Sequence, residues 1–230
     1  MQKLPRTRYE GIALWEFKRA PQTAALIKRV VKSPGGIALD LGCGSGAVMT
    51  EMAQLFEFIV GVDIDHSVLN PSNKVRKPNE YLLVADVRHL PIASWRVQLV
   101  YSYGALHHVD ESDALAEVRR VLKPGGLAVL VDFVNNIGHH STRRFGLYLE
   151  AMRALPGMVV HYGTLAGLRI FLWRLSPRWL RHVRADRFLT ASEFSYVYRS
   201  ALPGCAIKWL PPRRMVAIWR QPSPAKEEQS

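Results

Sequence analysis

The chain has 230 residues, of which 48% are hydrophobic, and a formal net charge of +12. We expect a single domain over residues 1–220, because this length is enough to bury one sizeable core. The two cysteines are far apart, which argues against a disulfide framework and against a zinc site, so no metal is expected. The first residues lack a signal-peptide pattern, and Arg169 interrupts the most apolar segment, so we expect a cytoplasmic protein without a membrane span.

The basic charge is concentrated in two segments that flank an acidic centre. Residues 1–36 carry a net charge of +6 and residues 134–188 carry +7, whereas residues 37–133 carry −4. This distribution predicts that the flanking segments, and not the centre, attract anionic partners.

The first part of the chain predicts helices over residues 1–36 and a parallel sheet over residues 37–133. Pro21–Lys32 is expected to be a helix that begins at the proline. Short apolar runs then alternate with helical stretches, as in βαβ units. The five predicted strands are Ile37–Leu41, Phe58–Val62, Tyr81–Ala85, Val97–Ser102 and Leu127–Phe133. Between the last two, Asp110 is expected to cap a helix that runs to about Leu122 and stops at a Lys-Pro-Gly-Gly turn.

The second part begins with residues 134–188, which interrupt this alternation. They are rich in Arg, Leu, Trp and Phe, and we expect a basic helical insertion. The regular pattern resumes in residues 189–220, where Thr190 and Glu193 have the spacing of a capping box. The elements expected there are a helix to about Ala201 and strands over Ala206–Leu210 and Met215–Arg220. The polar tail, residues 221–230, is expected to be disordered.

The strongest chemical signal is ALDLGCGSGAV at residues 38–48. Gly42, Gly44 and Gly46 allow a tight turn and let a ligand lie against the backbone where a helix begins. The spacing is GxGxG, and Asp40 precedes it. A carboxylate there repels a pyrophosphate but suits a ligand that carries an amino group and a sulfonium, such as S-adenosylmethionine. The alternative is that Asp40 only caps the following helix.

Two further acids end the second and third predicted strands. Asp63, in GVDID, lies about 20 residues beyond the glycine turn, where an acid can accept hydrogen bonds from ribose hydroxyls. Asp65 is expected to cap a helix instead. Asp86 can accept a bond from an adenine amino group while the amide of Val87 donates to a ring nitrogen. Acids at successive strand ends predict one rim of a binding crevice.

These motifs, with YSYGALHHVDE and EVRRVLKPGGLAVLVDF, resemble the small-molecule branch of the class I S-adenosylmethionine-dependent methyltransferases of type 11, over roughly residues 36–134. The resemblance implies a Rossmann-like, doubly wound α/β fold. Its sheet has seven mostly parallel strands, the last one antiparallel, with a helical insertion after the fifth strand. The implied cofactor is S-adenosyl-L-methionine. We expect it to contact Asp40, Gly42, Cys43, Gly44, Asp63, Ile64, Asp86, Val87 and Tyr103.

His107 and His108 are the residues near the expected methyl group that resemble a general base. The same histidine pattern occurs in the resembled family across acceptors that need no shared base, which favours a structural role. His108 is retained as a weak catalytic candidate. Methyl transfer from a sulfonium can also proceed by proximity and alignment alone.

The acceptor is expected to be recognised by the basic segments. In residues 165–188, apolar and aromatic side chains are interleaved with arginines, which is typical of a membrane interface but also of RNA binding or of a lid helix. Our leading hypothesis is a small, lipophilic or membrane-derived acceptor, with peripheral contact at the inner membrane surface. The alternatives are a tRNA or other RNA methyltransferase and a non-catalytic, cofactor-binding regulatory protein.

Overall fold

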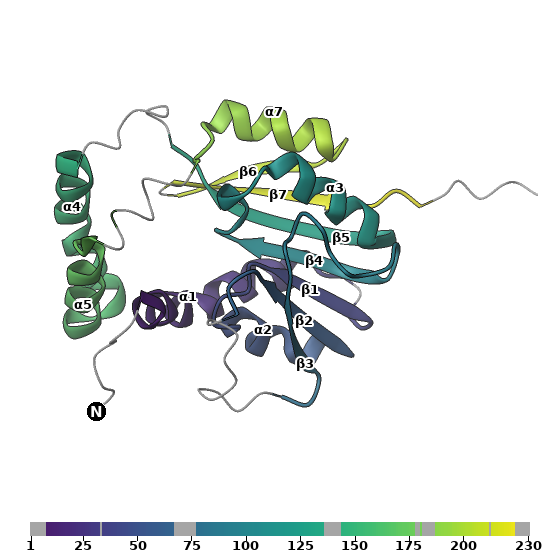
Figure 1. Cartoon of the computed structure of the whole chain (residues 1–230), viewed down its shortest axis with the longest axis horizontal. Helices are drawn as coiled ribbons and strands as arrows, with labels where there is room; N and C mark the ends of the chain where they lie inside the picture. The colour runs from purple at the N-terminus through teal and green to yellow at the C-terminus, as the bar shows by residue number, and fades with distance from the viewer. Residues whose placement is uncertain are drawn as a thin grey trace, which may run out of the picture.

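The computed structural model describes residues 8–32, 34–66, 77–135, 144–177, 180, 187–211 and 213–223. These residues form an α/β fold in which helices cover both faces of one sheet (Figure 1). The helix expected after Asp65 and most of the tail lie outside the described residues.

The sheet contains seven strands in the order β3-β2-β1-β4-β5-β7-β6. The strands are β1 Ile37–Leu41, β2 Phe58–Asp63, β3 Glu80–Val84, β4 Val97–Tyr103, β5 Leu122–Phe133, β6 Ala206–Leu210 and β7 Arg214–Arg220. β7 is antiparallel to β5 and β6, and the other pairings are parallel. The chain builds outward from β1 to β3 and then returns to place β4 on the other side of β1. The expected seven-stranded, mostly parallel, Rossmann-like sheet is therefore confirmed, and its switch point lies between β1 and β4.

β5 differs most from its predicted bounds. It begins at Leu122 and includes the Lys-Pro-Gly-Gly sequence that was expected to form a turn. Leu122 pairs with Val97, and the register then shifts before Leu99 pairs with Leu127. The two glycines therefore lie at an irregularity within the strand. It accommodates the residues by which β5 is longer than β4 between these two pairs.

Two helical layers cover the sheet, α1 and α2 on one face and α3 and α7 on the other (Figure 1). The helices are α1 Arg8–Val30, α2 Ala47–Met52, α3 Glu111–Val121 and α7 Ala191–Ala201, with short 3-10 helices at Ala53–Leu55 and Leu106–His108. The predicted caps of α3 and α7 are confirmed. The side chain of Asp110 accepts from the amide of Ser112, and Thr190 and Glu193 form the capping box.

The predicted start of the first helix at Pro21 is wrong, because α1 passes through this proline. A proline inside a helix costs about 3 kcal/mol through a lost hydrogen bond and a clash with the preceding turn. Here the helix buries Ala20, Ala24 and Ile27. We attribute its continuity to that burial, which spans both sides of the proline.

The segment between β5 and α7 contains a helical hairpin made of α4 Arg144–Tyr162 and α5 Thr164–Arg174. The two helices pack closely because Gly167 lies against the backbone of Met158, where a Cβ atom would not fit. They share a small core of their own, formed by Ala151, Met158, Ile170 and Phe171. The hairpin lies at the side of the sheet, next to α1 (Figure 1).

Candidate functional site

The carboxyl ends of β1, β2 and β3 lie side by side at one edge of the sheet. Leu41 is in register with Val62, and Asp63 with Val84. The carbonyl oxygen of Val62 accepts from the amides of Gly42 and Cys43, at 2.8 and 3.0 Å. The strand ends that carry the three predicted acids are thus neighbours in space.

The glycine turn is tied directly to Asp63. One carboxylate oxygen of Asp63 accepts from the amide of Gly44 at 2.9 Å, and the other accepts from the amide of Asp65 at 3.0 Å. Gly42 has a φ of 68°, and a Cβ atom there would collide with the Cβ of Ala105. Because a carboxylate has about four lone-pair sites, Asp63 keeps acceptor capacity for ligand hydroxyls while it holds the turn.

Asp40 is buried, at 4% exposure, and does not cap α2. The helix has Gly46 at its N-cap and no side-chain cap, so the alternative role for Asp40 is wrong. Burial, together with the nearby Asp40 carboxylate, raises the pKa of Tyr101 well above its ordinary value.

A pocket of about 390 Å³, including space open to solvent, lies against the glycine turn. It is lined by Arg19, Ala20, Thr23, Asp40, Gly42, Cys43, Ala47, Val48 and Tyr103. Four of the predicted site residues, Asp40, Gly42, Cys43 and Tyr103, therefore meet around one space, and α1 closes its other side. A carboxylate in such a pocket favours a positively charged ligand. The Asp40 carboxylate therefore fits the amino group and the sulfonium of S-adenosylmethionine.

Asp86 and Val87 follow β3, next to the end of β2, where the amide of Ala85 donates to the carbonyl of Asp63 at 3.1 Å. Arg88 holds the Asp86 carboxylate by side-chain bonds of 2.6 to 3.1 Å and by its own amide at 2.9 Å. These bonds lower the pKa of Asp86 to about 2. Val87 is buried, while Ile64 is 69% exposed at the rim. The pairing with Arg88 was not predicted.

The hydroxyl of Tyr103, at the end of β4, is contacted by side chains from two other elements. It accepts from Arg19 of α1 at 2.8 Å and from Arg214 of β7. Arg19 also donates to the hydroxyl of Tyr162, the last residue of α4, at 2.8 Å. Arg19, Tyr162 and Arg214 were not among the predicted site residues. The excess of basic charge in residues 1–36 is a signal for Arg19 alone.

The two adjacent histidines occupy different environments. His107 is buried, and its Nδ1 lies 2.6 Å from the Asp132 carboxylate, which also accepts from the His107 amide at 2.9 Å. The ring of His107 stacks on Phe188, with centroids 4.7 Å apart. His108 is exposed. Asp132, at the end of β5, was missed because it looked like an ordinary strand residue.

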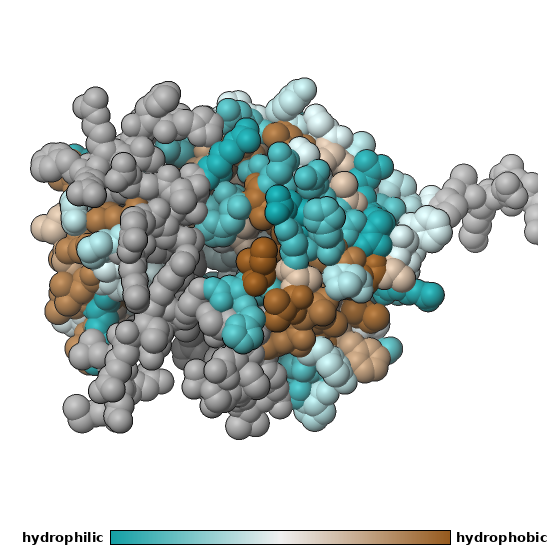
Figure 2. Space-filling model, in the orientation of Figure 1, coloured by the Kyte–Doolittle hydropathy of each residue, from teal (hydrophilic) through white to brown (hydrophobic). Residues whose placement is uncertain are grey.

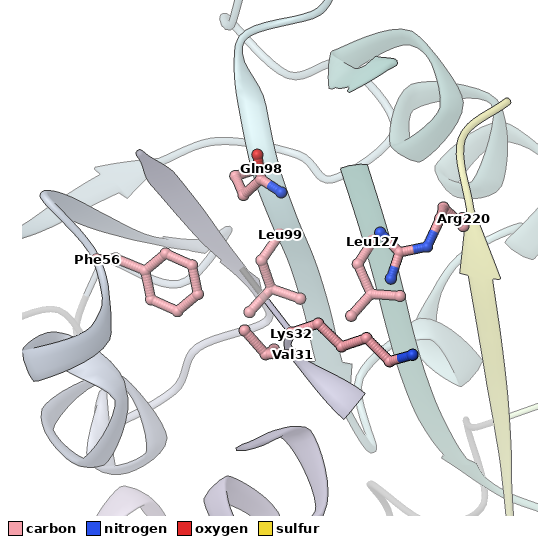
Figure 3. A pocket seen from close by; sticks show the side chains of 7 residues that line it. All are labelled: Val31, Lys32, Phe56, Gln98, Leu99, Leu127 and Arg220. Atoms are coloured by element: carbon pink, nitrogen blue, oxygen red, sulfur yellow. The ribbon is translucent and has the colours of Figure 1, made fainter. Parts of the chain in front are cut away.

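A second cavity, of about 230 Å³, lies at the opposite edge of the sheet. Figure 3 shows the residues that line it, among them Phe56, Gln98, Leu127 and Arg220. Leu127 and Gln98 lie toward the amino ends of their strands, and none of the predicted site residues takes part. In an open α/β sheet ligands bind at the carboxyl ends of the strands, so this cavity is not the candidate site.

Within the described part of the chain, no helix is long and apolar enough to cross a bilayer.

Comparisons with known proteins agree with this geometry. A family model described as a methyltransferase domain matches residues 39–130. An uncharacterized methyltransferase of Mycobacterium tuberculosis is 27% identical over 204 residues, which are 86% of this chain and 93% of that protein. The demethylmenaquinone methyltransferase of Corynebacterium urealyticum is 31% identical over 132 residues, or 57% of this chain and 55% of that protein.

Solved structures show the same fold. The S-adenosylmethionine-dependent methyltransferase of Mesorhizobium loti superposes with a TM-score of 0.60 at 17% identity, over 90% of this chain and 99% of that one. The geranyl diphosphate C-methyltransferase of Streptomyces coelicolor, solved with S-adenosyl-L-homocysteine, gives 0.58 at 12% identity, over 87% and 77%. The acid-rimmed glycine turn, the sheet order and these similar proteins support a methyltransferase, with the methyltransferase domain over residues 39–130.

Proposed function

We propose that this methyltransferase binds S-adenosyl-L-methionine at the carboxyl ends of β1 to β4 and methylates a small, lipophilic acceptor that it reaches from an anionic membrane surface. Bound there, the cofactor supplies an electrophilic methyl group on a sulfonium. The residues proposed to hold it are Asp40, Gly42, Cys43, Gly44, Asp63, Ile64, Asp86, Val87 and Tyr103. What supports this assignment is the buried Asp40 carboxylate beside an open pocket at the glycine turn.

The proposed division of labour follows the three strand ends. Asp40 and the glycine turn face the amino acid part, Asp63 accepts from the ribose, and Asp86 and Val87 contact the adenine. No side chain is required to attack, since transfer depends on alignment of the acceptor with the methyl group. His108 is exposed and stays our candidate base for an acceptor that loses a proton. His107, held by Asp132, is better suited to position the loop.

The single observation that supports a lipophilic acceptor is the exposure of apolar side chains on the α4–α5 hairpin. Seven large apolar side chains are exposed on these two helices: Tyr148, Leu149, Met152, Val160, Leu165, Leu168 and Leu172. Figure 2 shows hydrophobic surface over this part of the molecule. Exposed apolar clusters of this kind mark interaction surfaces.

The charge of the hairpin matches an anionic membrane. Residues 144–174 contain four arginines and one acid. Leu165, Leu168 and Leu172 follow one another at helical spacing, so they share one face of α5. Such a face can enter the interface between headgroups and acyl chains while the arginines bind phosphates. We therefore propose membrane contact through α4 as well as through the predicted segment, residues 165–188.

The hairpin is also connected to the cofactor pocket. Tyr162, at the end of α4, contacts Arg19, and Arg19 lines the pocket together with Tyr103. A lipophilic molecule that leaves the membrane along the hairpin would reach the end of the pocket where the methyl group is proposed to lie. Two of the similar proteins have names that state lipophilic acceptors, demethylmenaquinone and geranyl diphosphate.

Flotation of the full chain with vesicles of phosphatidylcholine and phosphatidylglycerol tests the membrane contact. We expect co-flotation that is lost when Leu165, Leu168 and Leu172 are all replaced by serine. A matched control is Tyr196→Ser, since Tyr196 is 75% exposed on α7, far along the chain from the hairpin. Equal flotation of the triple variant, or none of the parent, would remove the membrane from the proposal. Salt-sensitive retention of total tRNA on filters would favour the RNA alternative.

A further inference from the structure

Two guanidinium groups converge on a single phenol oxygen beside the cofactor pocket. Arg19 donates to the hydroxyl of Tyr103 at 2.8 Å, and Arg214 donates to the same oxygen. The guanidinium carbon of Arg214 also lies 5.9 Å from the centre of the Tyr103 ring. The two side chains come from α1 and β7, which are far apart in the sequence, so the tertiary structure alone brings them together.

Aromatic rings border these two cations. Phe133 packs edge-on against Tyr103, with centroids 6.2 Å apart, and against His107 at 6.0 Å. Arg214 is in register with Phe133 across the β5–β7 pair. The surroundings thus combine positive charge with apolar ring edges, which suits a molecule that has an anionic end and an apolar body.

The electrostatics of the pair favour an anion. Two like charges that donate to one neutral oxygen repel each other. Burial disfavours the charge of Arg19, yet Tyr103 and Tyr162 keep its pKa raised. The Nε atom of Arg214 is buried and has no hydrogen-bond partner among the described residues. A carboxylate or phosphate would offset the repulsion and accept from such donors.

We propose that Arg19 and Arg214 form a binding site for an anionic group, a carboxylate or a phosphate, of the methyl acceptor. The inference rests on the proposed function in one respect, that the acceptor approaches Tyr103. It narrows the lipophilic acceptor to an amphiphile whose charged group is fixed beside Tyr103, so that its apolar part extends toward the hairpin.

Calorimetric titration of inorganic phosphate and, separately, of acetate into the full chain saturated with S-adenosyl-L-homocysteine tests this site. Saturation fills the cofactor site, including the part that takes the cofactor's own carboxylate. We expect binding in the millimolar range, with Arg214→Gln weakening it about tenfold or more, because the two-pronged contact is lost. The preferred anion tells a phosphate-bearing acceptor from a carboxylate-bearing one. Arg214→Lys should restore only part of the affinity.

Arg220→Gln is the matched control, since Arg220 lies at the other end of the same strand and lines the cavity of Figure 3. Its anion affinity should equal that of the parent chain. Unchanged affinity for S-adenosyl-L-homocysteine shows that Arg214→Gln is folded. The inference is overturned if neither anion binds, if Arg214→Gln binds as well as the parent, or if phosphate displaces the cofactor product. Failure of the cofactor product to bind would instead count against the proposed function, and titration without it would still report on the arginine pair.

Discussion

The acid-bearing ends of β1 to β3 and the α4–α5 hairpin differ in their charge and in their exposure of apolar side chains. The strand ends are acidic and lie at the edge of a buried sheet. Backbone amides that donate to the Asp63 carboxylate and to the carbonyl of Val62 hold them in place. The hairpin is basic, exposes large apolar side chains, and has a separate small core. The contrast fits our proposal that the sheet binds the cofactor, whereas the helices added beside it choose the acceptor.

Among the described residues, polar side chains connect the two regions. Arg19 joins Tyr162 of the hairpin to Tyr103 of the sheet. Changes placed away from Arg19, at Asp63 or at the exposed leucines of α5, should leave the ligand of the other region largely unaffected, because distant sites respond nearly independently. The variants below use this independence, with cofactor affinity as the measure for the strand ends and vesicle flotation as the measure for the hairpin.

The largest effect is expected for Gly42→Ala. The residue has a φ of 68°, and its Cβ would collide with that of Ala105. We expect the free energy of unfolding to fall by about 2–4 kcal/mol, from the left-handed backbone and the overpacking together. Urea unfolding followed by circular dichroism measures it. Gly204→Ala is the control, because it has a φ of 79° but open space around it, and should cost about 1 kcal/mol. Equal losses in the two variants would contradict the steric account.

Asp63→Ala should weaken binding of S-adenosyl-L-methionine and of its demethylated product about tenfold or more. The variant removes an acceptor for ribose hydroxyls and leaves the amide of Gly44 without its partner. Calorimetry with both compounds measures the change. Vesicle flotation should stay as in the parent chain, and a joint loss of both activities would show that the two regions are not independent.

The smallest effect concerns the pair formed by Asp86 and Arg88. Since the pKa of Asp86 is lowered to about 2, its ionised form is favoured in the folded state. The stabilising contribution is therefore present above the unfolded pKa of about 3.9 and is lost as the pH falls toward 2. Carboxyl carbon NMR of Asp86 gives the titration directly. In Arg88→Ala the pKa should move back toward the unfolded value. An unmoved midpoint would show that another group holds the carboxylate.

Local patterns predicted much of this molecule. Strands β1, β2, β3, β4, β6 and β7 lie within one residue of their expected bounds, because apolar runs between turn residues are signals that neighbouring residues carry by themselves. The caps at Asp110 and Thr190 are equally local. The acids were recognised for the same reason, since each lies at or near the carboxyl end of a strand.

Other features depended on packing between distant segments. The helix passes through Pro21 because burial of side chains on both sides of it outweighs a local breaker. The glycines after Lys123 lie within β5 because pairing with β4 begins at Leu122. The contact of Asp132 with His107 is likewise one that spacing does not reveal.

The sequence by itself determined the parallel α/β core and the strand ends and predicts the kind of cofactor, because these depend on residue type and spacing within short segments. Only the tertiary structure decided that Arg19, Tyr103, Tyr162 and Arg214 meet at one point. They come from α1, β4, α4 and β7, and their distances are set by how the helices pack on the sheet. The sequence carries no periodic signal for such a convergence. Residue patterns therefore do not predict the place where the acceptor is proposed to bind.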